Sequence, residues 1–379
     1  MMTGCRTSTE AAAAASLLRI DLDAVAANYQ LLSRRLATAA CGAAVKADAY
    51  GIGACRVARR LARAGCRVFF VATLDEAVAL RAEVADTGVD IAVLCGALPG
   101  TESVLAEHRL IPVINDPGQI ARWRRAGERA GVPLDAMLHV DTGMNRLGLS
   151  PRETNRLAED PELLGGVNWR CLVSHLACAD DPDDPENTVQ LDRVRAVRAR
   201  LPAMPVSLAN SAGILLGPDW HFDLARPGIA LYGGGPQSGR KNPMHRVVTL
   251  LGRILQVRDI EPGMRVGYGG DYQACSPGRV ATVAAGYADG YLRSSAGCAR
   301  VHLGRIALPV VGRVSMDLIT VDVTEAPEAA VFPGALVELL GGRNTIDDAA
   351  AAAGTISYEI LTSLGRRYHR EYLEDAAAG

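Results

Sequence analysis

The chain has 379 residues, of which 22% are charged and 49% hydrophobic, with 40 Lys and Arg residues against 42 Asp and Glu residues. The formal net charge of -2 excludes a nucleic-acid binder held by bulk positive charge, and it equally excludes a disordered acidic protein. Lysine occurs only at Lys46 and Lys241, so arginine supplies nearly all of the cations. Because arginine cannot be deprotonated to act as a nucleophile or base, these two lysines are the candidates for amine chemistry.

The length suggests two domains, or one large barrel with an appendage. Nine cysteines form an odd set with no C-x-x-C pair, which indicates reduced thiols in a cytoplasm rather than a disulfide framework. The Ala-rich run near the N-terminus follows Glu10 and leads into a strand-like segment, which argues against a signal peptide. No stretch approaches the roughly 20 apolar residues that span a bilayer. We therefore expect a soluble, cytoplasmic protein with no membrane or nucleic-acid partner.

From residue 40 to about 230, short apolar segments with strand character alternate with helical segments such as 54–65 and 74–88. The predicted strands are 41–47, 67–73, 90–96, 110–114, 134–141, 168–175, 205–210 and 222–228. Such alternation predicts parallel pairing, because a crossover helix is what links parallel strands. Eight units predict an α/β fold with a (β/α)8 TIM barrel, and an open sheet is the alternative. In such barrels the chemistry lies where strands end, and notable polar residues fall there: Lys46, Asp141 to Arg146, His175, Asn210 and Arg226.

The pattern changes after residue 243. The following apolar segments are punctuated by glycine and mostly lack helices between them: 247–260, 278–288, 299–313, 317–323 and 335–341. This pattern predicts a separate, mainly antiparallel β domain. We therefore expect two domains, residues 16–243 and residues 244–379, and the strand-like segment 17–25 is compatible with either of them.

Lys46 lies in the segment AAVKADAYGIG (43–53), near the end of a predicted strand, and Tyr50 and two glycines follow it. A lysine at a barrel mouth is placed to form an imine with a carbonyl cofactor, and nearby hydroxyl and glycine residues are suited to a phosphate. The alternative is a surface lysine that caps a strand, and the scarcity of lysine in this chain argues against it.

Nine motifs occur in the order seen in alanine racemases: AAVKADAYG, DTGMNRLG, SHLACAD, LANSAG, ARPGIALYG, GYGGDY, AGYADGYLR, GRVSMD and ISYE. They extend from about residue 18 to residue 373, so nearly the whole chain resembles the alanine racemase family. The resemblance implies a fold-type III barrel that binds pyridoxal 5′-phosphate, a C-terminal β domain, and a homodimer with active sites shared between subunits. It further implies an isomerase that interconverts L- and D-alanine in D-alanine biosynthesis.

The same resemblance implies a role for each matching residue. Lys46 would carry the cofactor and act on one face of the substrate α-carbon, and Tyr268 of the partner subunit would act on the opposite face, as racemisation requires. Arg226 would face the pyridine nitrogen, and His175 would orient Arg226. The other residues implied at the cofactor are Tyr50, Arg146, Asn210, Ser211, Gly228, Ile229 and Tyr358. The residues implied at the substrate are Arg146, Met316 and Tyr287, and no metal is implied.

Four positions depart from the commonest family pattern: Ile52, His139, Asn145 and Ser315. His139 stands where many alanine racemases carry a lysine that becomes carbamylated and steadies the arginine corresponding to Arg146. A neutral imidazole can accept a hydrogen bond from Arg146 but supplies no fixed negative charge. We therefore expect looser control of Arg146, and a racemase of broader or different specificity, such as serine, is an alternative. The other interpretation is that neighbouring groups or a bound anion replace the carbamate and that the function is unchanged.

Two further alternatives belong to other classes of protein. One is a decarboxylase or other lyase with the same cofactor and fold, against which Arg226 and Tyr268 argue. The other is a non-catalytic cofactor-binding protein, and such barrels usually lack the second domain that carries Tyr268 here.

Overall fold

The computed structural model describes residues 13–374, which divide into two compact units. The barrel unit comprises residues 25–231 and 235–244, and the β unit comprises residues 13–24, 232–234 and 245–374. Among the described helices, none is both long enough and apolar enough to cross a membrane.

The barrel unit is built on a seven-stranded parallel sheet. In spatial order its strands are β3 (Ala43–Ala44), β4 (Val68–Val71), β5 (Asp90–Val93), β6 (Ile111–Ile114), β7 (Leu134–His139), β8 (Val167–Val173) and β9 (Val206–Ser207). The eighth position is taken by β10 (Leu224–Ala225), which pairs in parallel with β2 (Ala40–Cys41). The amide of Gly42 donates to Ala225 over 2.9 Å, and the amide of Arg226 donates to Ala209 over 2.8 Å. These bonds join the two edges of the sheet, and the predicted eight-stranded barrel is confirmed.

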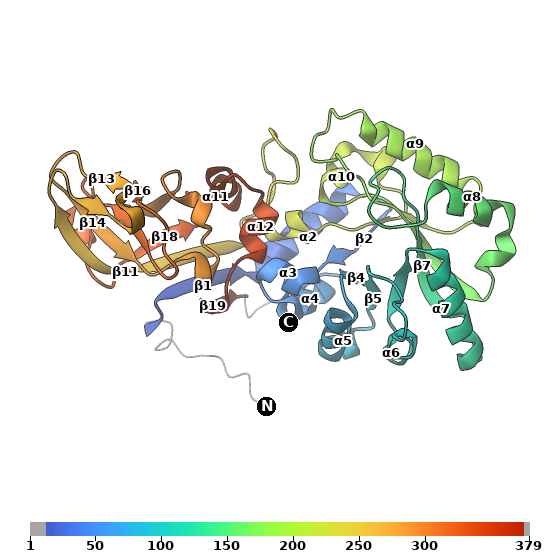
Figure 1. Ribbon diagram of the computed structural model, residues 1–379. Coiled ribbons are helices and arrows are strands. Elements are labelled where there is room, and N and C mark those ends of the chain that lie inside the picture. Colours follow the sequence, from blue (N-terminus) through green and yellow to red (C-terminus); the bar gives the residue numbers. More distant parts are fainter. Residues whose placement is uncertain (1–12, 375–379) are drawn as a thin grey trace. The chain divides into compact units, whose positions relative to one another are not determined.

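Helices follow the strands and lie outside them; Figure 1 shows α5, α6 and α7 outside β4, β5 and β7. Their bounds are α2 (Leu22–Arg35), α4 (Ala54–Arg63), α5 (Leu74–Glu83), α6 (Glu102–Glu107), α7 (Pro117–Ala130), α8 (Pro151–Glu159), α9 (Glu186–Arg198) and α10 (Ser211–Leu216). Inside the strands, one apolar cluster that includes Phe70, Val113, Met137 and Val173 fills the barrel. The barrel is therefore a packed core, and its chemistry is confined to its ends.

The β unit contains an eight-stranded sheet. Its strands are β1 (Ser16–Asp21), β11 (Val248–Ile260), β14 (Gly278–Val283), β15 (Arg300–Leu303), β16 (Ile306–Val311), β17 (Ile319–Asp322), β18 (Leu336–Leu340) and β19 (His369–Leu373). All pairs are antiparallel except β1 with β19, so the predicted mainly antiparallel domain is confirmed. Because β1 pairs with β11 from Ser16 to Ile20, the early strand belongs to this unit. Two short helices, α11 (Ile346–Ala353) and α12 (Ser357–Thr362), precede β19.

Candidate active site

The predicted site residues of the barrel unit gather at the carboxyl ends of its strands. Lys46 follows β3, His175 follows β8, Asn210 follows β9 and Arg226 follows β10. Parallel strands bring these ends to one rim, which is why residues far apart in the sequence meet there. The charges of Arg146 and Arg226 both act on the Lys46 amine, so these three cations share the barrel mouth.

The chain turns sharply after Lys46 in a conformation that the sequence did not predict. Strand β3 ends at Ala44 rather than at residue 47, and the four residues from Ala47 to Tyr50 then have φ values between 52° and 56°. This is the left-handed region, which costs roughly 1–2 kcal/mol for each residue that is not glycine. The sequence carries no glycine at these four positions to signal the turn. The turn buries Tyr50 and sets the direction in which the chain leaves Lys46.

The pKa of the Lys46 amine lies below its ordinary value. Burial is the main reason that its pKa lies below the ordinary value, and the positive charge of Arg146 lowers it further. Arg226 acts in the same direction, while Glu76 and Cys95 oppose it. A lysine whose pKa is lowered in this way spends more time unprotonated, which is the form that attacks a carbonyl carbon.

Arg226 is buried and held at both ends of its guanidinium fork. Its Nη1 donates to Ser207 Oγ over 2.5 Å, and its Nη2 donates to the carbonyl of Ser174 over 2.5 Å and to Nδ1 of His175 over 3.2 Å. Burial lowers the pKa of Arg226 to about 10, so it stays charged near neutral pH. The guanidinium carbon of Arg226 lies over the Phe70 ring, 5.9 Å from the ring centroid. The result is a rigid cation with a fixed direction.

The hydroxyl groups of Ser211 and Tyr50 and the backbone of Gly228 lie close together in the segment that follows Arg226 and in its neighbours. We call this group the cradle. Ser211 Oγ accepts from the amides of Gly228 over 2.8 Å and Ala230 over 3.3 Å, which leaves its proton to donate outward. A Cβ atom on Gly228 would lie 2.2 Å from the Tyr50 hydroxyl oxygen, so only glycine permits this packing. Asn210 caps α10 by accepting from the amide of Gly213 over 2.8 Å. Ile229, also predicted at the cofactor, is fully buried in the same loop. Hydroxyl groups are donors of the kind that bind a phosphate group.

The loop that carries Arg146 is organised by Asp141. The carboxylate oxygen Oδ1 of Asp141 accepts from the amides of Gly143, Met144 and Asn145 over 2.9, 3.0 and 3.1 Å. Asn145 has a φ of 55°, a left-handed conformation that asparagine tolerates better than most residues. The backbone of the loop therefore accommodates asparagine at this position.

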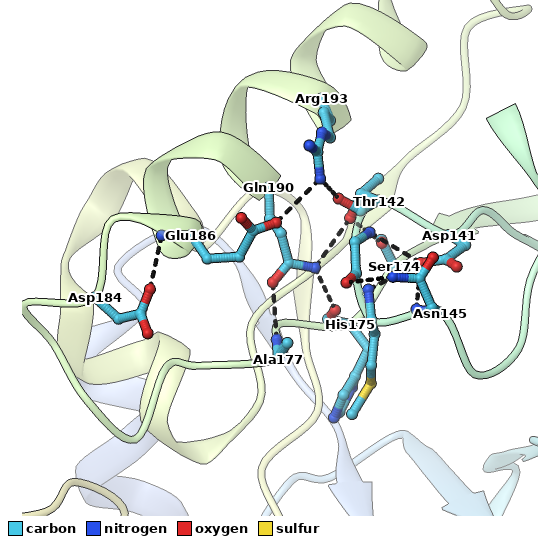
Figure 2. A network of polar contacts seen from close by, with 12 residues as sticks. Asp141, Thr142, Asn145, Ser174, His175, Ala177, Asp184, Glu186, Gln190 and Arg193 are labelled. Carbon is cyan, nitrogen blue, oxygen red and sulfur yellow. Dashed lines mark hydrogen bonds and ion pairs between the residues drawn. The ribbon is translucent and has the colours of Figure 1, made fainter.

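The buried side chain of Gln190 connects this loop to the one that carries His175 (Figure 2). Its Nε2 donates to the carbonyl of His175 over 2.9 Å and to Thr142 Oγ1 over 3.4 Å, and its Oε1 accepts from the amide of Ala177 over 2.8 Å. Arg193, one turn further along α9, donates to the carbonyl of Thr142 over 2.9 Å. Sequence reasoning missed Gln190, Ser207 and Glu76, because each acts through a contact that only the folded barrel brings about.

His139 is a neutral imidazole with a defined proton. Its Nδ1 lies 2.7 Å from Oδ1 of Asn115, whose Nδ2 donates to the carbonyls of Leu94 and Val113 over 3.0 and 2.8 Å. Because those carbonyls fix the amide orientation, Oδ1 is an acceptor and His139 donates from Nδ1. Burial, and next the charge of Arg226, lowers the pKa of His139 to about 4. The position thus supplies no negative charge.

The other four predicted site residues lie in the β unit, and all of them are exposed there. Their exposed fractions are 71% for Tyr268, 44% for Tyr287, 52% for Met316 and 39% for Tyr358. The amide of Tyr287 donates to the carbonyl of Ser315 over 3.1 Å, and the carbonyl of Met316 accepts from Ala288 over 2.9 Å. The loops that carry Tyr287 and Met316 are therefore held together.

A lysine with a lowered pKa, a rigid arginine and nearby hydroxyl groups at a barrel mouth are typical of enzymes that carry a phosphorylated carbonyl cofactor. Residues 20–236 match the alanine racemase N-terminal domain, and residues 247–372 match the alanine racemase C-terminal domain. The chain belongs to the alanine racemase family, as the nine motifs predicted.

Individual relatives cover nearly the whole chain. The alanine racemase of Rhodospirillum rubrum is 49% identical over 360 residues, which cover 95% of this chain and 96% of that protein. The catabolic alanine racemase of Mesorhizobium japonicum is 49% identical over 362 residues, covering 96% and 94% respectively. Among solved structures, the alanine racemase of Bartonella henselae with covalently bound pyridoxal phosphate has a TM-score of 0.92 at 39% identity. That match covers 95% of this chain and all of the other.

Proposed function

We propose that this chain is a pyridoxal 5′-phosphate-dependent racemase that interconverts L- and D-alanine. The main support for the proposal is the half-buried Lys46, with its lowered pKa, at the mouth of an alanine racemase barrel. In this proposal the barrel unit holds the cofactor and the β unit supplies Tyr268. The bound cofactor supplies an electron-withdrawing ring that acidifies the α-proton of an attached amino acid.

The barrel residues hold the cofactor and keep its environment positive. Lys46 is the point of covalent attachment, and Tyr50, Ser211, Gly228 and Ile229 receive the phosphate, with Asn210 capping α10 beside them. The proposal also assigns Tyr358 to the phosphate. Arg226, oriented by His175, faces the ring nitrogen. Because its guanidinium stays charged, that nitrogen stays unprotonated, which limits charge delocalisation into the ring and suppresses transamination.

Two bases complete the racemisation. Lys46 removes or returns the α-proton on one face, and Tyr268 of the partner subunit does so on the other, so that neither base has to move around the substrate. Arg146 binds the substrate carboxylate with a fork of donors, and Met316 and Tyr287 contribute to the substrate site.

A homodimer explains why Tyr268, Tyr287 and Met316 are so exposed in the single chain. Large apolar side chains that stand out in solvent, grouped on loops that hydrogen bonds hold together, are what a partner surface covers. We also place the enzyme in the cytoplasm, where it supplies D-alanine. The eight cysteines among the described residues are free thiols, which fits a reducing compartment.

A racemase with a broader range that includes serine is the second candidate. It is favoured by His139, whose neutral ring gives Arg146 no negative partner of the kind that the family often uses. Both candidates are tested by incubating the holoenzyme in D₂O with single L-amino acids, followed by chiral analysis and mass measurement. We expect α-deuterated D-alanine from L-alanine. Release of carbon dioxide would indicate a lyase, and no reaction with any amino acid would indicate a binding protein.

A further inference from the structure

We propose that Glu76 is a positioning residue for Lys46, because its carboxylate anchors the left-handed turn that follows the lysine. The inference rests on the proposed role of Lys46 and adds a residue to which the proposed function assigns nothing. Glu76 lies in the first turn of α5, thirty positions further along the chain.

The carboxylate of Glu76 joins two segments that are separate in the sequence. Its Oε1 accepts from the amide of Ala47 over 2.7 Å, and its Oε2 accepts from the amide of Ala72 over 2.7 Å. Ala47 directly follows the lysine, and Ala72 directly follows strand β4. One carboxylate therefore ties the backbone beside Lys46 to the rim of the neighbouring strand.

In the sequence Glu76 resembles an ordinary helix-capping residue. Its shortest hydrogen bonds, however, are to the amides of Ala47 and Ala72 and not to its own helix cap. In a capping box the glutamate accepts from the backbone amide of the N-cap residue, here Thr73, and that bond is 3.4 Å long. The capping box of α8 is the comparison within the same barrel. There Glu153 accepts from the amide of Ser150 over 2.8 Å and from its hydroxyl over 2.7 Å. The Glu76 carboxylate is thus drawn away from its own helix toward Ala47.

The turn needs an anchor at its first residue. Further along, the amide of Ala49 donates to the carbonyl of Val45 over 2.8 Å, and Asp48 accepts from the amides of Gly53 and Ala54. Glu76 satisfies the amide at the start, where four left-handed residues begin. Without it, the strained backbone next to Lys46 loses the bond that holds it to the barrel rim.

The charge of Glu76 also acts on the lysine directly. Burial, Arg146 and Arg226 lower the pKa of Lys46, while the carboxylate of Glu76 and the thiol of Cys95 raise it. Glu76 thus has two separable effects, one through geometry and one through charge.

Two variants separate these effects. Glu76→Gln keeps the length of the side chain but loses the charge. Its carboxamide nitrogen faces one of the two backbone amides and cannot accept a hydrogen bond from it. Glu76→Asp keeps the charge but is too short to reach both amides. Glu153→Gln is the matched control, because it removes the same charge from a capping box that does not contact the lysine segment.

Amide hydrogen exchange on the full-length holoenzyme measures how firmly the backbone turn after Lys46 is held. In peptides covering residues 46–54, we expect exchange about tenfold faster in both Glu76 variants and unchanged in Glu153→Gln. We also expect kcat for alanine to fall about tenfold or more, with KM within about twofold, because the amine is misplaced rather than the substrate site.

Amine labelling of the cofactor-free full chain measures the effect of the Glu76 charge on the pKa of Lys46. Lys46 and Lys241 are the two lysines of the chain, so each labelled peptide reports one site and Lys241 is an internal reference. As pH rises, labelling of Lys46 sets in when its amine deprotonates. We expect the midpoint for Lys46 to move to lower pH in Glu76→Gln, by about half a pH unit, and to stay in place in Glu76→Asp. Lys241 should be unaffected in both.

The outcomes separate this inference from the proposed function. If exchange near residue 47 and the labelling midpoint of Lys46 are both unchanged in Glu76→Gln, Glu76 is not a positioning residue, whatever Lys46 does. If Lys46→Ala retains covalent cofactor and turnover, the proposed function itself is wrong. A Glu76→Gln protein that does not fold leaves Glu76→Asp to decide by its exchange rate.

Discussion

Arg226 donates from Nη2 to Nδ1 of His175 over 3.2 Å, and this contact fixes the protonation state of the imidazole. A guanidinium nitrogen offers only hydrogen atoms, so Nδ1 must carry a lone pair and His175 is neutral. Burial is the first cause that holds the pKa of His175 well below its usual range, and the charge of Arg226 is the second. The pair therefore presents one positive charge at the barrel mouth, and that charge belongs to Arg226.

The guanidinium of Arg226 depends on Ser207, which no motif in the sequence singled out. Ser207→Ala removes the acceptor of Nη1 and leaves a buried charged donor without its partner. We expect the free energy of unfolding of the apoprotein to fall by about 2 kcal/mol, measured by urea denaturation. Ser238→Ala, at an exposed loop position, is the control and should change it by less than about 0.5 kcal/mol. Equal stability of the two variants would show that Arg226 does not need this bond.

His139 makes the protein less stable in acid. The unfolded chain takes up a proton on this histidine as pH falls through about 6.5, whereas the folded chain does so only near pH 4. Proton binding therefore favours the unfolded state between these values, and about 3 kcal/mol of stability is lost as pH falls through that window. His139→Gln, which keeps a donor for Asn115, should flatten this part of the curve of unfolding free energy against pH. His175 contributes with the same sign in both proteins, so identical slopes would contradict the assignment to His139.

Gly228→Ala tests the cradle beside Tyr50. The new methyl group would lie 2.2 Å from the Tyr50 hydroxyl oxygen, so the tyrosine must move away from the position proposed for the phosphate. We expect cofactor affinity to fall about tenfold or more, measured by fluorescence titration of the cofactor-free protein. Tyr50→Phe, which removes only the hydroxyl, should weaken binding by a smaller factor. Wild-type affinity in Gly228→Ala would place the phosphate elsewhere.

Tyr268→Phe tests the second base. We expect covalent cofactor to be retained and racemisation to fall about 10²- to 10⁴-fold, the usual contribution of a general acid or base. In D₂O, proton NMR should show that one alanine enantiomer still exchanges its α-proton through Lys46 while the other does not. If both enantiomers exchange at wild-type rates, Tyr268 is not a base.

The architecture was predictable because its signals are local. Buried parallel strands form continuous apolar runs, and the helices between them indicate parallel pairing; the count of eight units then favoured a barrel over an open sheet. The rarity of lysine drew attention to Lys46 before any fold was known. The order of nine motifs then indicated the family.

Contacts that depend on barrel closure were not predictable. The turn after Lys46 is left-handed at four positions without glycine, so no residue type signals it. The segment TLDE at residues 73–76 predicts a capping box, and the structure contains one. Nothing in this segment indicates that Glu76 also accepts a hydrogen bond from Ala47. Gln190 reads as one more polar residue on a surface helix, although it is completely buried between two loops of the site.

Borohydride reduction of the holoenzyme, followed by peptide mass mapping, shows whether Lys46 is the amine that carries the cofactor. Reduction makes the bond between lysine and cofactor permanent, and a chain with two lysines gives an unambiguous map. We predict the added mass on the peptide that contains Lys46 and none on the peptide that contains Lys241. Attachment at Lys241, or no attachment in an active enzyme, would show that Lys46 is not the residue that carries the cofactor.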